Sequence, residues 1–324
     1  MLRHVFLVLS LTPMLVACGA TGENGTAVFM VGSSWQPAVP IAAGSVFAIS
    51  AHRSDLFQTS LTVETDTPSV IAPKGGAFEA LAAGAAVIKA MDPSSNAEVD
   101  RIGYTVAKTA TAGLAYWPDV LLTPTARVAP EFAVLAGAQV PLRARLADAL
   151  QRELNHQAVA SLAAAATATT AVSVAPDAEQ RVFQLTAATL PAEASLTFAV
   201  ARGSEAALTA THTVHVVDLV AVAKLEIGKT QVQIQAEGTP GSDTAQGAPD
   251  VQAGKRLYFV RILATTAQGL RIYGVPAVWT VTAGTAQLGT TAPSEYQYFE
   301  LSNGQAVTLQ AVAGSQTAEV TIAY

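Results

Sequence analysis

Short, strand-length runs rich in apolar residues, separated by Gly, Pro and Asp, make up most of this chain. In its first third, such runs lie at residues 46–51, 61–64, 84–90 and 101–106, and the run at 61–64 alternates between apolar and polar residues. Alternation with a period of two predicts half-buried β-strands, because successive side chains of a strand point to opposite faces of its sheet. Strands spaced by about 8–12 residues, with turn signals between them, predict a β-sandwich or a barrel.

The same pattern continues through the rest of the chain. Further strand-length runs lie at residues 140–146, 171–177, 196–201, 211–217, 225–234, 257–264, 275–281, 307–314 and 318–324. Residues 237–249 are polar and rich in Gly and Pro, which predicts a loop of unusual length for a compact domain. The whole chain is therefore expected to be all-β.

Residues 146–168 allow two interpretations. Ala, Leu, Gln, Arg and Glu are strong helix formers, and the leucines at the start of this stretch fall on one helical face. The alternative is a turn at Asp148 followed by a strand from Val159. We favour the strand, because Thr and Val residues, which suit strands, lie directly downstream.

Two segments of the first third carry a family resemblance. Residues 66–72 read Asp-Thr-Pro-Ser-Val-Ile-Ala, and residues 80–90 read Ala-Leu-Ala-Ala-Gly-Ala-Ala-Val-Ile-Lys-Ala. Their order resembles that of the bacterial immunoglobulin-like (BIG2) family. The runs at 257–264 and 275–281 are similar to the B and C strands of such domains, with Trp279 at the core position of strand C. The resemblance implies tandem immunoglobulin-like β-sandwiches.

The N-terminus has the layout of a secretory signal. Arg3 and His4 form a basic start, and residues 5–16 form an apolar stretch. This stretch is too short to span a bilayer, which takes about 20 residues. It ends in Leu-Val-Ala-Cys at residues 15–18, and Cys18 is the only cysteine of the chain.

Residues 15–18 resemble the lipobox of bacterial lipoproteins. The resemblance implies cleavage before Cys18, attachment of a diacylglyceryl group to its thiol, and acylation of the new amino group by a fatty acid such as palmitate. Two or more acyl chains anchor a protein stably to a membrane. Gly19 follows the cysteine, and this residue favours sorting of a lipoprotein to the outer membrane. It does not distinguish the periplasmic face of that membrane from the cell surface. The alternatives are a cysteine beside a cleavage site by coincidence and a plain secreted protein.

These patterns predict the division of the chain. Residues 1–17 are a signal peptide, and residues 18–27 are a lipidated tether whose Gly-rich, polar part has little to bury. Immunoglobulin-like domains follow at residues 28–108, 112–218 and 219–324.

Composition argues against some classes of function and of site. The formal net charge is -6, which argues against nucleic acid, since nucleic-acid binding needs a clustered basic face. Charged residues make up 13% of the chain, about half of the usual ~25%. With one cysteine the chain has no disulfide framework and no cysteine-based metal site.

The sequence contains no constellation that predicts catalysis. No Ser lies in a G-x-S-x-G elbow, and no phosphate-binding G-x-x-x-x-G-K loop is present. His212 and His215 would point to opposite faces of a strand, so a metal site is not expected there. Residues 92–100 form the densest cluster of oxygen ligands, which fits either an ordinary hairpin turn, the interpretation we favour, or a calcium site. We therefore expect no enzyme, no cofactor and no metal.

Aromatic residues are the remaining candidates for ligand binding. Tyr296 and Tyr298 would share one face of a strand, and Trp117 lies near a predicted domain boundary. Exposed aromatics can stack on sugars or anchor a protein partner, whereas the alternative is packing in a core or between domains. The expected function is a lipid-anchored structural or adhesion protein of the cell envelope, or else an envelope protein that binds polysaccharide. The expected partners are the membrane, through lipid on Cys18, and an envelope protein or polysaccharide.

Overall fold

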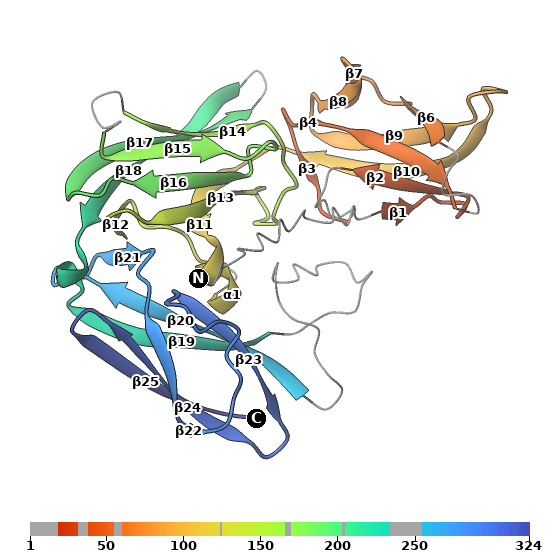
Figure 1. The fold of residues 1–324 in the computed structure, drawn as a ribbon. Coiled ribbons are helices and arrows are strands. Elements are labelled where there is room, and N and C mark those ends of the chain that lie inside the picture. Colours follow the sequence, from red (N-terminus) through yellow and green to blue (C-terminus); the bar gives the residue numbers. More distant parts are fainter. Residues whose placement is uncertain are drawn as a thin grey trace, which may run out of the picture.

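A computed structural model describes residues 19–31, 38–54, 60–123, 125–165, 170–202, 205–232 and 255–324. In this part of the chain nearly all regular structure is β-strand, and the strands build three successive sandwiches (Figure 1). The prediction of an all-β fold with tandem immunoglobulin-like β-sandwiches is confirmed. Cys18 and residues 1–17 lie outside the described residues.

The first sandwich has two facing sheets. Its strands are β1 (Gly19–Thr21), β2 (Ala27–Val31), β3 (Ile41–Ala42), β4 (Val46–Phe47), β5 (Ile49–Arg53), β6 (Ser60–Thr65), β7 (Ile71–Lys74), β8 (Ala77–Ala80), β9 (Gly84–Met91) and β10 (Glu98–Ala107). One sheet has the order β1-β2-β5-β6-β9-β10-β3 and the other β4-β8-β7. Alternate residues of the long strands, such as Ile88 and Val106, are buried with Phe29 and Phe47 in one core.

The structure differs from the tether predicted for residues 18–27. Gly19 to Thr21 pair antiparallel with β2, so this segment is the first strand of a hairpin. The turn of the hairpin is held by Asp100 of β10, whose buried carboxylate accepts hydrogen bonds from the backbone N–H groups of Asn24, Thr26 and Ala27 at 2.9–3.0 Å.

Two features explain why residues 20–26 are ordered in spite of their composition. The carboxylate that holds the turn comes from a strand 73–76 residues further along the chain, so no local pattern announces it. Gly22 lies against this carboxylate, and a Cβ at that position would be 2.4 Å from Cγ of Asp100. Glycine is thus needed here for a close approach of backbone and side chain, not for flexibility.

The second sandwich follows after a short connection. Its elements are β11 (Thr111–Tyr116), the helix α1 (Trp117–Leu122), β12 (Glu131–Leu135), β13 (Gln139–Ala147), β14 (Ala160–Ala164), β15 (Val172–Pro176), β16 (Val182–Ala187), β17 (Ala192–Arg202) and β18 (Glu205–Val217). One sheet has the order β11-β13-β16-β15, and the other begins β14-β17-β18-β12. Between them lies a core that includes Phe132, Phe183 and Phe198.

The third sandwich begins after a 3-10 turn at Leu219–Ala221. Its strands are β19 (Lys224–Val232), β20 (Lys255–Thr265), β21 (Arg271–Tyr273), β22 (Val278–Gly284), β23 (Tyr296–Ser302), β24 (Ala306–Ala313) and β25 (Gln316–Ala323). β19, β20 and β23 form one layer, and the facing sheet has the order β22-β24-β25. Trp279 packs between them, as expected for its place in strand C, and donates its indole N–H to the carbonyl of Ser294.

The strand order of the second sandwich is that of the immunoglobulin fold. In the second sandwich, β11-β13-β16-β15 correspond to strands A-B-E-D of one sheet, and β14-β17-β18 correspond to C-F-G of the other. In both the first and the second sandwich a short early strand runs parallel to the last one, β3 beside β10 and β12 beside β18.

The ambiguous stretch at residues 146–168 has no helix in its described part. β13 ends at Ala147, and the carboxylate of Asp148 then accepts the backbone N–H groups of Leu150 and Arg152 in a turn. β14 begins at Ala160, so the favoured interpretation, a turn followed by a strand, is confirmed.

Candidate functional site: the joints between sandwiches and an aromatic patch

The second and third sandwiches share one continuous sheet. β12 pairs in parallel with β18 of its own sandwich along its whole length. On its other edge β12 pairs in parallel with β21 of the third sandwich, where Ala133 lies opposite Ile272 and Val134 opposite Tyr273. The strand order β14-β17-β18-β12-β21-β20-β19 therefore runs across the joint. Hydrogen bonding of this kind restrains two domains more than a linker does, since linked domains move by default.

Alternate side chains of β12 enter two different cores. Phe132 and Val134 are buried among the apolar residues of the second sandwich, and Ala133 is buried among those of the third. Because both faces of the strand are covered, its sequence is continuously apolar at these positions instead of alternating. β12 is thus a structural part of both sandwiches.

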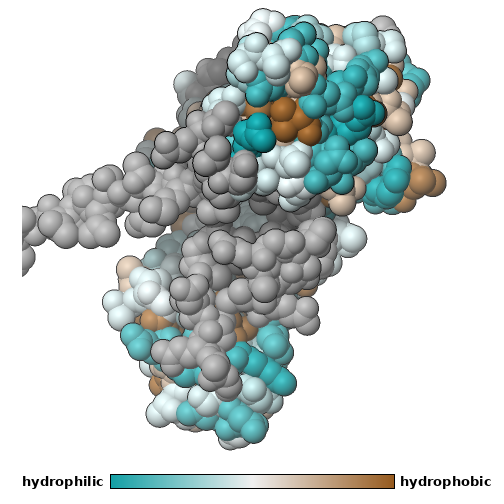
Figure 2. Space-filling view, turned by 90° about the vertical axis from the view of Figure 1, so that its right-hand side faces the viewer, coloured by the Kyte–Doolittle hydropathy of each residue, from teal (hydrophilic) through white to brown (hydrophobic). Residues whose placement is uncertain are grey.

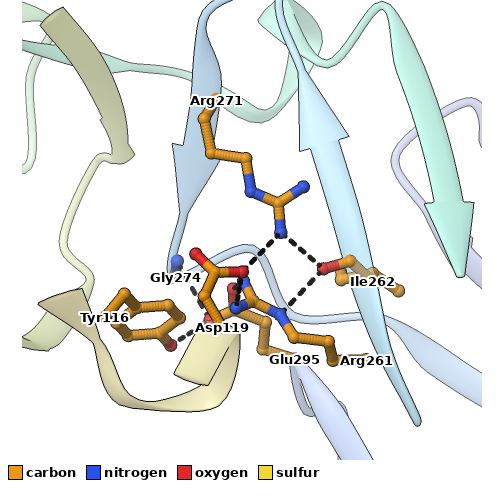
Figure 3. A network of polar contacts seen from close by, with 7 residues as sticks. All are labelled: Tyr116, Asp119, Arg261, Ile262, Arg271, Gly274 and Glu295. Carbon is orange, nitrogen blue, oxygen red and sulfur yellow. Dashed lines mark hydrogen bonds and ion pairs between the residues drawn. The ribbon is translucent and has the colours of Figure 1, made fainter. Parts of the chain in front are cut away.

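A network of charged side chains crosses the same joint (Figure 3). Arg261 of β20 is fully buried, and it pairs with Asp119 of α1 and with Glu295, whose Oε1 lies 2.7 Å from Nη2. Arg271 Nη2 lies 3.7 Å from the same Asp119 oxygen and donates to the carbonyl of Ile262. The carboxylate of Asp119 comes from the second sandwich and both guanidinium groups from the third, so the ion pairs join the two.

Aromatic rings complete this network. Tyr116, at the end of β11, donates its hydroxyl hydrogen to Oε2 of Glu295, and the guanidinium carbon of Arg261 lies 4.8 Å from the centroid of its ring. The backbone N–H of Gly274 donates to the same oxygen of Glu295 at 3.1 Å. Tyr273 packs edge-on against Tyr116 with ring centroids 4.8 Å apart. Both oxygens of Glu295 therefore have donors.

Burial controls the protonation of these groups. It raises the pKa of the Glu295 carboxyl above its ordinary value, although the charge of Arg261 and the hydrogen bond from Tyr116 act in the opposite direction. Burial also raises the pKa of the Tyr116 hydroxyl, and the charge of Glu295 adds to this effect. Buried ion pairs contribute little net stability, but separating their partners is costly. The network can therefore hold the two sandwiches in one relative orientation.

The sequence interpretation missed this network. One signal was present: Arg261 is the one charged residue in the otherwise apolar run at 257–264, and a charge inside a buried strand needs a partner. Asp119 and Glu295 carry no such signal, because each follows an ordinary turn-forming segment and meets Arg261 only in the folded chain.

Asn155 joins the first and second sandwiches. Its backbone N–H donates to the carbonyl of Pro40, and its own carbonyl accepts the N–H of Ala42, both at 2.8 Å. Its side-chain amide donates to the carbonyl of Val39 at 2.9 Å. These bonds make a parallel bridge between Ile41 of β3 and Asn155. Backbone hydrogen bonds between sandwiches therefore occur at this joint as well.

His156 lies next to this bridge and is buried. Its Nε2 is 3.1 Å from the carbonyl oxygen of Ala144, and its Nδ1 has no hydrogen-bond partner among the described residues. Burial lowers the pKa of this imidazole from 6.5 to about 3, and the charges of Arg181 and Arg143 act in the same direction. The carbonyl of Ala144 and the charge of Glu153 oppose this shift without cancelling it.

The stability of the chain is expected to fall as the pH drops below about 6.5. The unfolded chain then takes up a proton at His156, which the folded chain excludes until the pH approaches about 3. Between pH 7 and pH 5 this difference lowers the free energy of unfolding by about 2 kcal/mol. Urea unfolding of the wild type and of His156→Gln at both pH values measures it. The wild type should lose about 2 kcal/mol more than the variant, and equal losses would contradict this explanation.

The structure brings two of the predicted site residues together. Tyr296 and Tyr298 share one face of β23, as predicted, with ring centroids 5.9 Å apart, and both pack on Phe259 of β20 at 5.6 and 5.1 Å. Tyr296 is 41% exposed and Tyr298 is half-buried. Burial raises the pKa of the Tyr298 hydroxyl to about 12. We call these three residues the aromatic patch.

Trp117 makes a different contact. It is the first residue of α1, and the guanidinium carbon of Arg143 lies 5.3 Å from the centroid of its ring. Among the described residues, no ring contact joins Trp117 to Tyr296 or Tyr298. Cys18, the predicted lipidation site, lies outside the described residues.

The polar clusters take structural roles. His212 is buried beside Phe132, whereas His215 lies on the outer face, 2.8 Å from Oε1 of Glu131, so the two histidines point to opposite faces as predicted. Asp92 Oδ1 accepts the backbone N–H groups of residues 94 and 95, which makes an ordinary turn. No three His, Cys, Asp or Glu side chains are arranged around a possible metal position in the described ranges.

The surface of the described residues carries scattered apolar side chains. Figure 2 shows one face, on which hydrophobic residues occur in small areas separated by hydrophilic ones. The large apolar residues with high exposure come from different elements: Leu81, Leu150, Leu190, Val220, Val278 and Tyr296. Helices that could cross a membrane are absent from the described ranges.

The chain matches no family model and no curated protein. Among solved structures, it is similar to domains 4–9 of the surface layer protein SbsC, with 15% identity and a TM-score of 0.38 over 87% of this chain and 43% of that one. It is also similar to the Escherichia coli adhesin FdeC, with 12% identity and a TM-score of 0.24 over 95% of this chain and all of that one. The D00-D0 domain of intimin is similar as well, with 12% identity and a TM-score of 0.25 over 66% of this chain and all of that one. This chain thus spans less than half of the SbsC fragment. Its fold is assigned from its own strand pairing.

Proposed function

We propose that the chain is a lipid-anchored structural or adhesion protein of the bacterial cell envelope, without enzymatic activity. Residues 15–18, with the lone cysteine Cys18, would be the site of cleavage and lipidation. One observation of the fold supports this most: Gly19, the next residue, already lies in the first strand of the first sandwich. Every described residue of this strand pair follows Cys18, so cleavage before Cys18 would leave the pair intact.

The joints support a structural role. The shared sheet at β12, the Arg261 network and the Asn155 bridge restrain the sandwiches relative to one another. A lipid on Cys18 would then hold the first sandwich close to the membrane, because the hairpin that begins at Gly19 leaves little slack. Such an array of restrained sandwiches can hold the surface of its last sandwich at a fixed distance from the membrane. Gly19 after the cysteine favours the outer membrane.

Replacement of Cys18 by Ser tests the anchor. The wild type, expressed in a bacterium that makes lipoproteins, should partition into the detergent phase and carry a metabolically supplied palmitate label. Cys18→Ser should lose the label and appear as the uncleaved precursor or in the soluble fraction. Ser315→Ala, on an exposed turn, is the matched control and should behave as the wild type. A Cys18→Ser protein that is mature, labelled and detergent-dependent would refute the proposal.

The aromatic patch supports a second candidate, polysaccharide binding. Tyr296 is exposed and is held by Tyr298 and Phe259, so its ring is rigid enough to stack on a sugar. Affinity electrophoresis in gels that contain extracted envelope polysaccharide measures this binding. Tyr296→Ala should weaken it about tenfold, since one stacked aromatic contributes more than about 1 kcal/mol. Val278→Ala, at another exposed position, should bind as the wild type. Equal retardation of both variants and the wild type would exclude the aromatic patch as a polysaccharide-binding site.

A further inference from the structure

A cleft with a volume of 160 Å³ lies where the first and second sandwiches meet (Figure 1). The first sandwich lines it with apolar residues. The connection between β10 and β11, the end of β17 and the start of β18 line it with polar ones. Pockets for drug-sized ligands have volumes of roughly 300–1,000 Å³, and a water molecule takes up about 30 Å³. The cleft therefore has room for about one small ring.

The apolar side of the cleft is held by backbone hydrogen bonds. It consists of Ala43, which follows β3, and residues 81–83, which join β8 to β9. The backbone N–H of Gly44 donates to the carbonyl of Ala80 at 2.6 Å, which ties these two segments together. Leu81 is 47% exposed. This side therefore offers a fixed apolar surface, and covering it with the apolar face of a ligand is favourable.

The opposite side of the cleft carries charges that are already paired. The carboxylate of Glu205 lies between two cations, 2.5 Å from Nζ of Lys108 and 3.4 Å from Nη1 of Arg202. An ionic ligand would have to compete with these pairs. A neutral hydroxyl group both donates and accepts hydrogen bonds, so it can bond a further ammonium or guanidinium N–H and a carboxylate oxygen while the pairs persist.

Thr109 also lines the cleft, and its hydroxyl group is not used by the fold. The residue is 2% exposed, and its Oγ1 has no hydrogen-bond partner among the described residues. A buried hydroxyl without a partner lowers stability, so its presence calls for an explanation. Since no hydrogen bond holds Oγ1 in place, rotation about χ1 can turn the hydroxyl toward a ligand.

The joint next to the cleft keeps its two sides in place. Ala42, which directly precedes Ala43 of the cleft, donates its N–H to the carbonyl of Asn155 of the second sandwich. The N–H of Ala43 donates to the carbonyl of Ala107, the residue before Lys108, at 2.9 Å. Sites for small ligands are usually preformed and often lie between domains. The cleft has both properties.

We propose that this cleft binds one neutral sugar residue of an envelope polysaccharide. The C–H face of the sugar ring would pack on Leu81 and its neighbours, and its hydroxyl groups would bond Glu205, Arg202 and Thr109. The volume limits the ligand to a single ring, the paired charges favour a neutral one, and the two unlike sides favour one with an apolar face and a hydroxyl edge. The choice of an envelope polysaccharide rests on the proposed function, but the site is separate from the aromatic patch.

Saturation-transfer difference NMR on the full chain tests the site, in a detergent without sugar headgroups. The probe is the mixture of neutral mono- and disaccharides released by acid hydrolysis from the envelope polysaccharide of the bacterium that makes the protein. The wild type should bind at least one of these sugars. Thr109→Val should bind it at least about threefold more weakly, since a hydrogen bond between neutral groups is lost. Thr111→Val, the same change at an exposed position two residues away, should bind as the wild type.

Stability separates a lost contact from a folding defect. Thr109→Val should unfold at no lower urea concentration than the wild type, because valine leaves no unpaired hydroxyl in the interior. Leu81→Ser tests the apolar side and should also weaken binding at least about threefold. Leu190→Ser, at an exposed leucine of another loop, should not.

Four results would overturn the proposal. They are no binding of any sugar by the wild type, binding of a matched mixture of free amino acids but not of sugars, wild-type affinity in Thr109→Val, and wild-type affinity in Leu81→Ser. Tyr296→Ala should bind the sugar as the wild type does, because the aromatic patch is a different site. Loss of binding in Tyr296→Ala with full binding in Thr109→Val would assign the sugar to the aromatic patch, which supports the second candidate function and overturns the cleft.

Discussion

Replacing Arg261 with Met is expected to lower the free energy of unfolding by about 3–5 kcal/mol, the usual cost of removing one partner of a buried ion pair. Arg261 is fully buried, and its removal leaves Glu295 without its ion-pair partner and Asp119 with Arg271 alone, 3.7 Å away. Urea unfolding at pH 7 measures the loss. Lys224→Met is the matched control, because the Lys224–Glu226 pair is exposed, and the unfolding of this variant should be nearly unchanged.

The pH dependence of the Arg261→Met variant separates a lost ion pair from a general packing defect. Burial already raises the pKa of Glu295, and without Arg261 it should rise further. The folded variant then binds a proton more tightly than the unfolded chain, so its deficit relative to the wild type should shrink as the pH falls from 7 to 5. The double variant Arg261→Met/Glu295→Gln should recover part of the loss. A deficit that is the same at both pH values, with no recovery in the double variant, would contradict this account.

Replacing Asp100 with Ala is expected to lower the free energy of unfolding by about 3 kcal/mol. A hydrogen bond to a charged acceptor contributes about 1.5–3 kcal/mol, and the substitution removes the acceptor from all of its backbone donors at once. The carboxylate is buried and accepts three backbone N–H groups of the N-terminal hairpin, as well as the N–H of Arg101. Burial by itself would raise the pKa of this carboxyl, but the backbone hydrogen bonds outweigh it and hold the pKa below its ordinary value.

Hydrogen exchange shows whether the loss at Asp100 is local. The amides of Asn24, Thr26 and Ala27 should exchange much faster in Asp100→Ala, while those of β24 should exchange as in the wild type. Asp92→Ala is the control, since its carboxylate also accepts backbone N–H groups but lies in an exposed turn. Unchanged protection of the hairpin in Asp100→Ala would show that another feature orders residues 19–31.

The strands could be predicted from the sequence where one face meets a core and the other meets solvent. The runs at 84–90 and 101–106 became β9 and β10, whose residues largely alternate between buried and more exposed. The run at 257–264 became β20, which is buried on both faces over Leu257–Ile262 and was recognisable by its strand-length, nearly unbroken apolar run. β12 was missed, because both of its faces are buried and its apolar residues do not alternate. A short strand of this type carries no periodic signal.

The joints could not be predicted, since their partners are brought together only by the fold. Asn155 bonds residues of β3 and its approach, more than 100 positions earlier in the chain. Arg261 meets Asp119 across 142 positions. The position of Tyr296 and Tyr298 on one face, in contrast, follows from the period of a strand and was predicted correctly. Local patterns thus predict elements and their faces, whereas the ion pairs between sandwiches depend on tertiary structure.

The mass of the N-terminal fragment tests the lipid anchor most directly. The protein would be isolated from the membranes of the bacterium that makes it, digested, and analysed by mass spectrometry. We expect a fragment that begins at Cys18 and carries the mass of a diacylglyceryl group, with a further acyl chain on its amino group where the host adds one. A fragment that begins at Met1, or at any residue other than Cys18, or an unmodified Cys18, would contradict it.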